Sequence, residues 1–129
     1  MDCDPHSLGR QGEQRAAEYL QSIGYKIIER NYRYRHNEID IIARHKGTLC
    51  FIEVKTRGSL DKGHPIEAVT LQKQKEIIKV AKAYLLTIEE REPDCRFDVI
   101  ALLADPGDND GNTPFVIEHF IDAFWEESR

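Results

Sequence analysis

The most regular pattern in the chain is a pair of apolar segments, Asn37–Ala43 and Leu49–Arg57, separated by a short polar stretch. Both segments are rich in β-branched and aromatic residues, which favour strands. If Lys46-Gly47 forms a two-residue turn, His45 pairs with Thr48. The pattern therefore predicts a β-hairpin in which the numbers of opposite residues have a constant sum.

This register places carboxylates against each other. Asp40 lies opposite Glu53, and Glu38 lies opposite Lys55. The side-chain period of 2 puts two sets of residues on one face, namely Glu38, Asp40 and Ile42 with Phe51, Glu53 and Lys55. Opposite Cβ atoms are roughly 5 Å apart, and like charges there are destabilising. A divalent cation with oxygen ligands would supply the counter-charge, so the hairpin predicts a metal site.

Apolar periodicity predicts the other elements. They are a helix from about Leu8 or Gly9 to Ile23, a strand from Lys26 to about Tyr34, a polar loop over Gly58–Pro65, a short helical stretch near Ile66–Val69, a long helix over about Thr70–Glu90, and strands over Cys95–Leu103 and Phe115–Ile121. The order is helix, three strands, helix, two strands. It predicts an α/β fold with a mixed central sheet of about five strands flanked by helices, in which the long helix forms a parallel crossover.

The length predicts one domain over residues 1–129. We expect residues 1–6 to be disordered, residues 104–113 to form an exposed loop, and residues 122–129 to form an acidic tail. No apolar run approaches the roughly 18 residues of a spanning helix, and the polar N-terminus is not a signal peptide, so no membrane partner is expected. Three widely spaced cysteines without a CxxC pair predict reduced thiols in a cytoplasmic protein.

Charge is unevenly distributed along the chain, although its net value is −5. Residues 1–88 hold 15 Lys and Arg against 11 Asp and Glu, whereas residues 89–129 hold 3 against 12. The basic part surrounds the carboxylate hairpin, which is compatible with a phosphate-binding face. Lys75, Lys79 and Lys82 on the long helix form either a solvated face or one that faces DNA. Phe124-Trp125 is either a docking patch or packs against the sheet edge.

Glu13 lies on the apolar stripe of the first helix, one turn before Ala16 and Ala17. One interpretation is a glutamate near the helix start that is stabilised by the macrodipole. The other is a further acidic member of the site formed by Asp40 and Glu53. The helix pattern is compatible with both.

Asp40, a gap and then Glu53-Val54-Lys55 are similar to the PD-(D/E)xK signature of the restriction-endonuclease-like nucleases. Glu13 is similar to the additional acidic residue of archaeal Holliday-junction resolvases. Six blocks spread over Leu8–Ile121 closely resemble the YraN-like family of uncharacterised bacterial proteins, namely Gly9-Arg10-x-Gly12-Glu13-x-x-Ala16, Asn31-x-Arg33, Glu38-Ile39-Asp40, Phe51-x-Glu53-Val54-Lys55-x-Arg57, Ala68-Val69-x-x-x-x-Lys73 and Arg96-Phe97-Asp98-Val99. Two positions depart from the pattern: Ile39 replaces the proline of the signature, and Asn37 stands where the family is expected to have glycine.

The resemblance implies a restriction-endonuclease-like core and a metal-dependent nuclease acting on DNA, with branched or damaged DNA as candidate substrates. Asp40 and Glu53, with the Val54 carbonyl, would bind Mg²⁺ or Mn²⁺, and Glu13 would complete the shell directly or through water. Lys55 would orient or activate the attacking water and offset charge at the scissile phosphate. The implied contacts to the nucleic-acid backbone are Arg33, Arg35, Arg57 and Lys73.

Two other hypotheses compete with the nuclease. The chain would be a nucleic-acid-binding module that keeps the fold without cleaving, or a structural protein whose carboxylates form salt bridges to Arg33, Arg35 and Lys55. Glu38 is either the ladder partner of Lys55 or a residue of the outer coordination shell of the metal. Resolvases of this fold often work as dimers, so a two-fold homodimer is expected by analogy.

Overall fold

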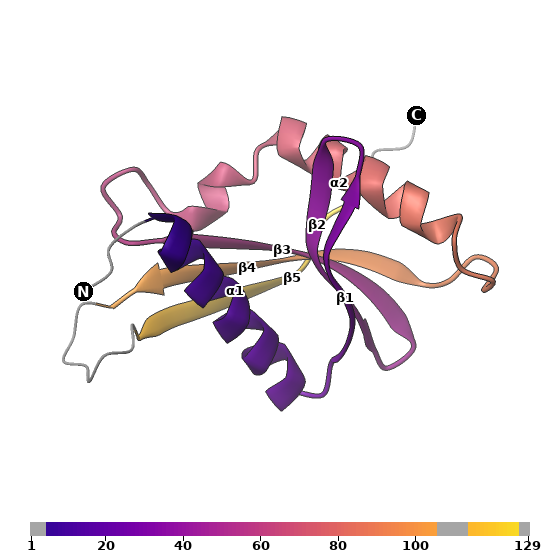
Figure 1. The fold of residues 1–129 in the computed structure, drawn as a ribbon, viewed down its shortest axis with the longest axis horizontal. Coiled ribbons are helices and arrows are strands. Elements are labelled where there is room, and N and C mark those ends of the chain that lie inside the picture. Colours follow the sequence, from indigo (N-terminus) through magenta and orange to yellow (C-terminus); the bar gives the residue numbers. More distant parts are fainter. Residues whose placement is uncertain (1–4, 106–113, 127–129) are drawn as a thin grey trace.

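The computed structural model describes residues 5–105 and 114–126, and Figure 1 shows its arrangement. Five strands form one sheet in the order β1-β2-β3-β4-β5. The strands are β1 (Lys26–Tyr34), β2 (Asn37–His45), β3 (Thr48–Arg57), β4 (Cys95–Ala104) and β5 (Phe115–Phe124). The helices are α1 (Pro5–Ser22), the 3₁₀ helix η1 (Pro65–Ala68) and α2 (Leu71–Leu85). The predicted order of elements and the predicted five-stranded sheet are confirmed.

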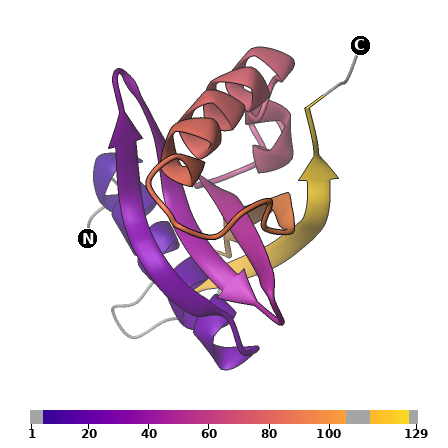
Figure 2. The same ribbon diagram turned by 90° about the vertical axis from the view of Figure 1, so that its right-hand side faces the viewer.

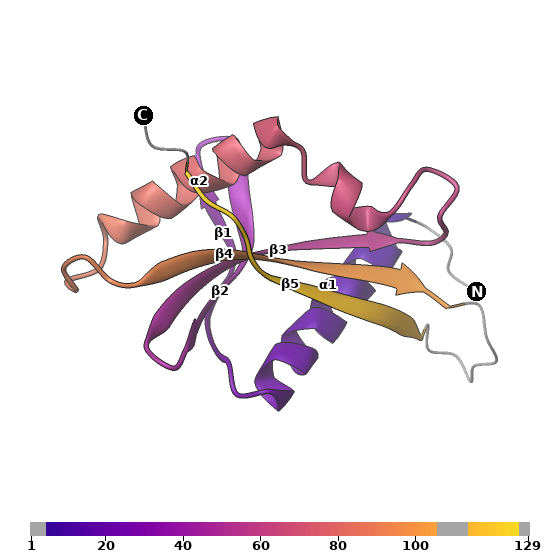
Figure 3. The same ribbon diagram turned by 180° about the vertical axis from the view of Figure 1, so that it is seen from behind.

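The sheet is antiparallel except for β3 and β4, which are parallel. The segment that contains η1 and α2 forms the crossover between these two strands, as the sequence predicts. Helix α1 packs on one face of the sheet and α2 on the other (Figure 2). The loop after β3 lies at the same end of the molecule as the start of α1 (Figure 3), and Gly58 approaches Leu8 there.

The β2–β3 hairpin has the predicted turn and register. Lys46 and Gly47 both have positive φ, at 51° and 85°, which is the conformation of a two-residue hairpin turn. Ladder pairing runs from His45–Thr48 to Ile41–Ile52 and ends there. The predicted ladder pair of Glu38 with Lys55 is therefore wrong. Glu38 pairs instead with Arg33 of β1, because β2 follows β1 beyond the point where it leaves β3.

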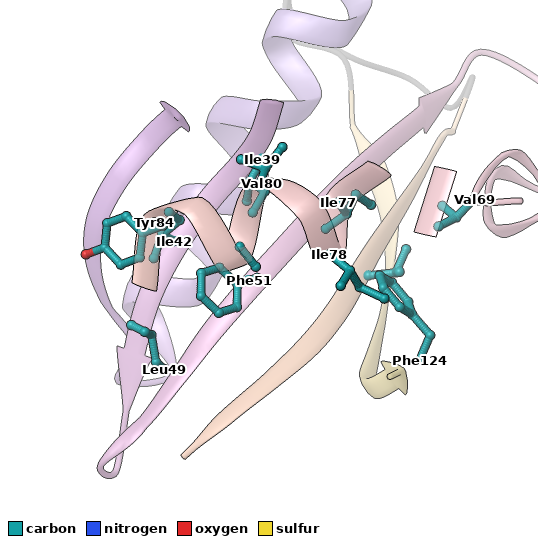
Figure 4. Packing of buried hydrophobic residues seen from close by; sticks show 12 residues of the cluster. Ile39, Ile42, Leu49, Phe51, Val69, Ile77, Ile78, Val80, Tyr84 and Phe124 are labelled. Carbon is teal, nitrogen blue, oxygen red and sulfur yellow. The ribbon is translucent and has the colours of Figure 1, made fainter. Parts of the chain in front are cut away.

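Two hydrophobic clusters occupy the two faces of the sheet. On the α2 side, Ile77, Val80 and Tyr84 of the helix pack over Ile42 and Phe51 of the strands (Figure 4). The cluster on the α1 side contains Ala16, Ala17, Leu20, Ile41, Ile52 and Ile100. Most of these side chains are fully buried, so the two clusters supply the main favourable free energy of folding.

Strand β2 changes phase between the two clusters. Ile39 and Ile42 both belong to the α2-side cluster, whereas Ile41 belongs to the α1-side cluster. Residues two apart in a regular strand share a face, so the alternation is broken at Asp40. The predicted common face therefore holds for Ile42 and Phe51 but does not continue to Glu38.

The structure differs from the predicted elements mainly at their ends. Helix α2 ends at Leu85 rather than near Glu90, because the next residue, Leu86, is 89% exposed and has no core to pack against. The Leu86 N–H and the Thr87 hydroxyl donate to carbonyls of the last turn and close it. Helix α1 begins at Pro5, a residue suited to a first turn, so residues 5 and 6 are helical. Residues 1–4 of the expected disordered segment lie outside the described residues.

Strand β5 extends into the segment expected to be a tail. Phe124 is its last residue and is buried against Phe97, with the two ring centroids 5.0 Å apart. Phe124 therefore packs on the sheet, whereas Trp125 is 67% exposed. The last three residues of the tail, 127–129, and most of the predicted loop, 106–113, lie outside the described residues. Within the described part of the chain, no helix has the length and apolar character needed to cross a membrane.

A polar network crosses the α1 side of the sheet at Asp98, which is fully buried in β4. His119 Nε2 lies 2.9 Å from Asp98 Oδ2, Arg96 Nε donates to Oδ1 over 3.0 Å, and the Asp122 N–H donates to the same oxygen. Burial opposes the charge of Asp98, yet these hydrogen bonds hold the pKa of its carboxyl below the ordinary value. The Tyr19 hydroxyl contacts His119 Nδ1 at 3.1 Å, so the network ties α1 to β4 and β5.

Gly12 allows α1 to approach β3 closely enough to place Glu13. A Cβ at Gly12 would lie 2.0 Å from Thr56 Oγ1 and 3.0 Å from its Cγ2, whereas a Cβ at Gly9 would meet nothing within 4 Å. We expect Gly12→Ala to destabilise the fold by about 1–3 kcal/mol, because α1 must move away from the strand. Gly9→Ala should be neutral or stabilise by up to about 1 kcal/mol.

Urea unfolding of the two variants measures the difference. Adding Thr56→Ala to Gly12→Ala removes the closest atom, Oγ1, together with Cγ2 and leaves the Thr56 Cβ at 3.0 Å. The double variant should recover part of the loss, a non-additivity expected only of residues in contact. Equal effects of Gly9→Ala and Gly12→Ala would contradict this account of the helix position.

Candidate active site

Asp40 and Glu53 lie together inside the sheet, and each is only 7% exposed. Asp40 Oδ2 accepts a hydrogen bond of 2.8 Å from the Val54 N–H, which crosses from β3 to β2 just beyond the last ladder pair. Glu53 Oε2 lies 3.7 Å from Lys73 Nζ. The other oxygen, Glu53 Oε1, is buried and has no hydrogen-bond partner among the described residues. The two carboxylates that the sequence pairs are thus neighbours.

Both carboxyl groups hold their protons more tightly than usual. Burial, and next the nearby charge of Glu53, raise the pKa of Asp40 well above its ordinary value, although the Val54 amide opposes the shift. Burial also raises the pKa of Glu53, against the lowering effect of the Lys73 ammonium. In the absence of a further cation, keeping both groups charged costs free energy.

Two further carboxylates, Glu13 of α1 and Glu38 of β2, lie near Asp40. One carboxylate oxygen from each of Glu13, Glu38 and Asp40 lies within 4.8 Å of the others. Asn31 Nδ2 donates to Glu13 Oε1 and to Glu38 Oε2, each over 3.1 Å. Arg33 forms a 3.0 Å ion pair with Glu38 Oε1. Glu13 therefore lies with Glu38 and Asp40 in one group of carboxylates.

The phase change in β2 explains how elements from both faces reach one place. Glu13 comes from α1 and Lys73 comes from α2, on opposite faces of the sheet. Asp40 stands where β2 leaves β3, so it contacts the backbone of β3 and also faces Glu13. We call the group Glu13, Glu38, Asp40 and Glu53 the acidic cluster.

The predicted basic residues occupy four different settings. Lys55 is half-buried two residues after Glu53, close enough for its charge to lower the pKa of Glu53. Lys73 forms an ion pair with Glu53, and its predicted contact with a phosphate would be a second interaction. Arg33 is exposed and is the ion-pair partner of Glu38. Arg57 ends β3, and its Nε is buried without a hydrogen-bond partner among the described residues.

Arg35 is exposed and lies in the turn between β1 and β2. Its guanidinium carbon is 5.3 Å from the centroid of the Tyr34 ring. Val54 contacts Asp40 through its amide nitrogen, and its carbonyl remains a predicted ligand. The roles of all these residues toward a metal or a nucleic acid stay predictions.

Asn31 is the site residue whose role the sequence patterns miss. Its φ of 53° lies in the left-handed region, which asparagine tolerates better than most residues. This backbone conformation departs from that of a regular strand. The side-chain amide of the same residue donates hydrogen bonds to both Glu13 and Glu38. The signal in the sequence is the Asn31-x-Arg33 block of the family resemblance, which marks the position but assigns Asn31 no role.

The donor set suits a hard divalent cation. Carboxylate oxygens are the ligands that Mg²⁺ and Mn²⁺ prefer, and the acidic cluster offers them without histidine or cysteine, from the buried Asp40 and Glu53 and the half-buried Glu13 and Glu38. The unpartnered Glu53 Oε1 is a buried acceptor that a cation would satisfy. Glu13, Glu38 and Asp40 therefore fit a divalent cation, and this set differs from the predicted ligands because it contains Glu38 and does not contain Glu53.

The raised pKa of Asp40 predicts how stability depends on pH without metal. A carboxyl whose folded pKa lies above its unfolded pKa adds stability at low pH, and loses it as pH rises through the folded value. Asp40→Asn removes the charge and keeps an acceptor for the Val54 N–H. We expect the variant to have a higher Tm than the wild type at pH 7 in EDTA. The increase should be about 4 °C for each kcal/mol by which removing the charge raises the free energy of unfolding.

The difference in Tm should shrink as the pH is lowered through the raised pKa, because wild-type Asp40 then becomes neutral too. Thermal melts from pH 7 to acidic pH measure it. Asp61→Asn, at an exposed loop position, is the control and should show no such trend. A pH-independent difference for Asp40→Asn would contradict the assigned burial of charge.

Asn31→Gly tests the amide that links Glu13 to Glu38. Glycine accepts positive φ without strain, so the variant removes the amide and keeps the backbone. Two carboxylates then lose their common donor, and we expect Mn²⁺ affinity to fall about tenfold or more, as for other groups that orient metal ligands. Calorimetric titration measures the loss. Asn37→Gly, at the first residue of β2, is the same substitution outside the acidic cluster and serves as the control, and an equal effect there would contradict the assignment.

Comparison with known proteins agrees with the resemblance found in the sequence blocks. The description "Uncharacterised protein family UPF0102" belongs to the family model that matches residues 12–102. A UPF0102 protein of Chlorobium limicola is 75% identical over 128 residues, which cover 99% of each chain. Relatives from Prosthecochloris aestuarii and Chloroherpeton thalassium are 58% and 44% identical, over 98% and 92% of this chain and 100% and 93% of their own. The chain therefore belongs to the UPF0102 family, the YraN-like family that its sequence blocks resemble.

Proposed function

We propose that this protein is a divalent-metal-dependent nuclease that hydrolyses phosphodiester bonds in DNA. The observation that carries the proposal is the buried pair of Asp40 and Glu53, whose oxygen Glu53 Oε1 has no hydrogen-bond partner among the described residues. A protein that kept this pair only for structure would be expected to neutralise it internally.

Asp40 and Glu53 would hold Mg²⁺ or Mn²⁺, with Glu13 and the Val54 carbonyl as further ligands. A bound metal of this kind supplies positive charge for the oxyanions of an in-line displacement and lowers the pKa of water. The chain's own contribution is orientation. The Val54 N–H fixes the Asp40 carboxylate, and Asn31 restrains Glu13.

Lys55 would donate hydrogen bonds to the attacking water and to the scissile phosphate from its place beside Glu53. Lys73 restrains Glu53 Oε2 and adds positive charge on the α2 side. Arg57 would hold a phosphate from the end of β3, where its Nε has no hydrogen-bond partner among the described residues. Preorganised donors of this type stabilise charge that develops in the transition state.

The structural hypothesis is weaker on this geometry. Among the described residues, Arg33 forms an ion pair with Glu38 and Lys73 forms one with Glu53, but no Lys, Arg or His forms an ion pair with Asp40. The non-cleaving binding module remains the rival, since it would keep the same site. We further propose branched or damaged DNA as substrate and a homodimer, both by analogy with resolvases. Cys50 and Cys95 are free thiols, which supports the proposed cytoplasmic location.

Titration of Mn²⁺ into the wild type, Asp40→Asn and Asp61→Asn tests the metal site. We expect binding to the wild type and to the Asp61 control, and a loss of about tenfold or more in Asp40→Asn. If the free protein is silent, the titration is repeated with DNA present, because phosphate oxygens complete many magnesium sites. Silence there too would overturn the metal site.

Cleavage assays on flap, junction and linear DNA separate the nuclease from the binding module. We expect Lys55→Ala to keep Mn²⁺ binding but to lower cleavage about 10²-fold or more, because it removes a group needed at the reacting phosphate. Lys62→Ala, in the exposed loop after β3, is the charge-matched control. Wild-type protein that binds metal and DNA but cleaves none of these substrates would favour the binding module.

A further inference from the structure

The outer side of α2 carries two hollows that share Lys79 and Lys82. One, of about 470 Å³, lies between the helix and Trp125. The other, of about 340 Å³, lies between the helix and the hairpin tip at Tyr34 and Arg35. The end of β5 lies beside α2 (Figure 3). Because Lys79 and Lys82 line both hollows, the two form one continuous surface. We call the residues Tyr34, Arg35, Lys75, Lys79, Lys82 and Trp125 the α2 strip.

The α2 strip is strongly basic in a protein with a net charge of −5. Arg35, Lys75, Lys79 and Lys82 line the two hollows, and Glu126 is the acidic residue among the described lining residues. Glu126 lies 2.6 Å from Lys82 Nζ, in an exposed pair that solvent screens. The surface is therefore complementary to a polyanion.

Aromatic rings stand at both ends of this basic surface. Trp125 is 67% exposed, and Tyr34 is 37% exposed with the Arg35 guanidinium near its ring. Single exposed apolar side chains are common on protein surfaces, so the significant feature is the position of these two rings at the ends of one basic surface. Lysines that follow a phosphate backbone, with aromatic rings on which bases stack, are the recognition elements for single-stranded nucleic acid.

We propose that the α2 strip binds an unpaired strand of nucleic acid, with Lys75, Lys79 and Lys82 at phosphates and with bases stacked on Tyr34 and Trp125. A duplex would satisfy the lysines but not the rings, because its bases are already stacked. The strip also leads to the acidic cluster, since α2 carries Lys73 beside Glu53 and the hairpin carries Arg33 beside Glu38. Resting on the proposed function, this makes the substrate a nucleic acid with an unpaired segment next to the cleaved bond.

Fluorescence anisotropy in EDTA tests the strip independently of the metal site. The probes are labelled oligothymidylate of about 15 nucleotides, the matching oligouridylate, and a duplex of the same length. We expect Trp125→Ala to weaken binding of the single strand about five- to a hundredfold and that of the duplex less than about twofold. Lys79→Ala should lower the slope of log affinity against log salt by about 0.7.

Val116→Ala and Lys26→Ala, at exposed positions outside the strip, are the matched controls and should leave binding unchanged. Unchanged single-strand affinity in Trp125→Ala, or equal losses for strand and duplex, would overturn the proposal. So would a wild-type dimer that Trp125→Ala dissociates in sedimentation, since the strip would then join two copies of the chain. Absence of Mn²⁺ binding and cleavage with this pattern intact would overturn only the nuclease. DNA and RNA are distinguished by which oligonucleotide binds more tightly.

Discussion

The fold is arranged around two carboxylates, Asp40 and Glu53, buried side by side between apolar strands. Burying like charges is expensive unless a counter-charge is close. Lys73 partly offsets Glu53, and the Val54 amide partly offsets Asp40. The pKa values of both carboxyl groups nevertheless remain raised. The hydrophobic clusters on the two faces of the sheet must therefore stabilise a site that would be more stable without its charges, a trade-off typical of functional centres.

A local break in regular structure makes this site reachable from both faces. In a regular strand, Ile39 and Ile41 would share a face, but here they pack in different clusters. The break coincides with the end of the β2–β3 ladder and lies beside Asn31, whose φ is positive. A sheet without this break would keep α1 and α2 separated by its full thickness. Glu13 and Lys73 could then not meet the same pair of carboxylates.

Sequence patterns predict the parts of this arrangement that depend on local chemistry. Lys46-Gly47 specifies the turn, and the turn specifies the register that brings Asp40 to Glu53. The same register assigns Glu38 to Lys55 wrongly, because period-2 reasoning assumes that the ladder continues and cannot see where the strands separate. The end of α2 is missed for a similar reason. Leu86 continues the helical pattern, but only tertiary packing decides whether a residue has a core to join. Asn31 contacts Glu13 across 18 positions, a relation that no local pattern contains.

Acidic and basic side chains of the site come from different elements. Acidic groups reach the site from α1 and β2, whereas Lys73 and the lysines of the α2 strip belong to α2, on the other face of the sheet. Under the proposed function, a polyanion approaching from the α2 side meets positive charge first and carboxylates behind it. A divalent cation between the two satisfies both, because carboxylate and phosphate oxygens are ligands of the same kind. The raised pKa values and the basic strip are then two consequences of one requirement, that the site bind a cation and a phosphate chain at the same place.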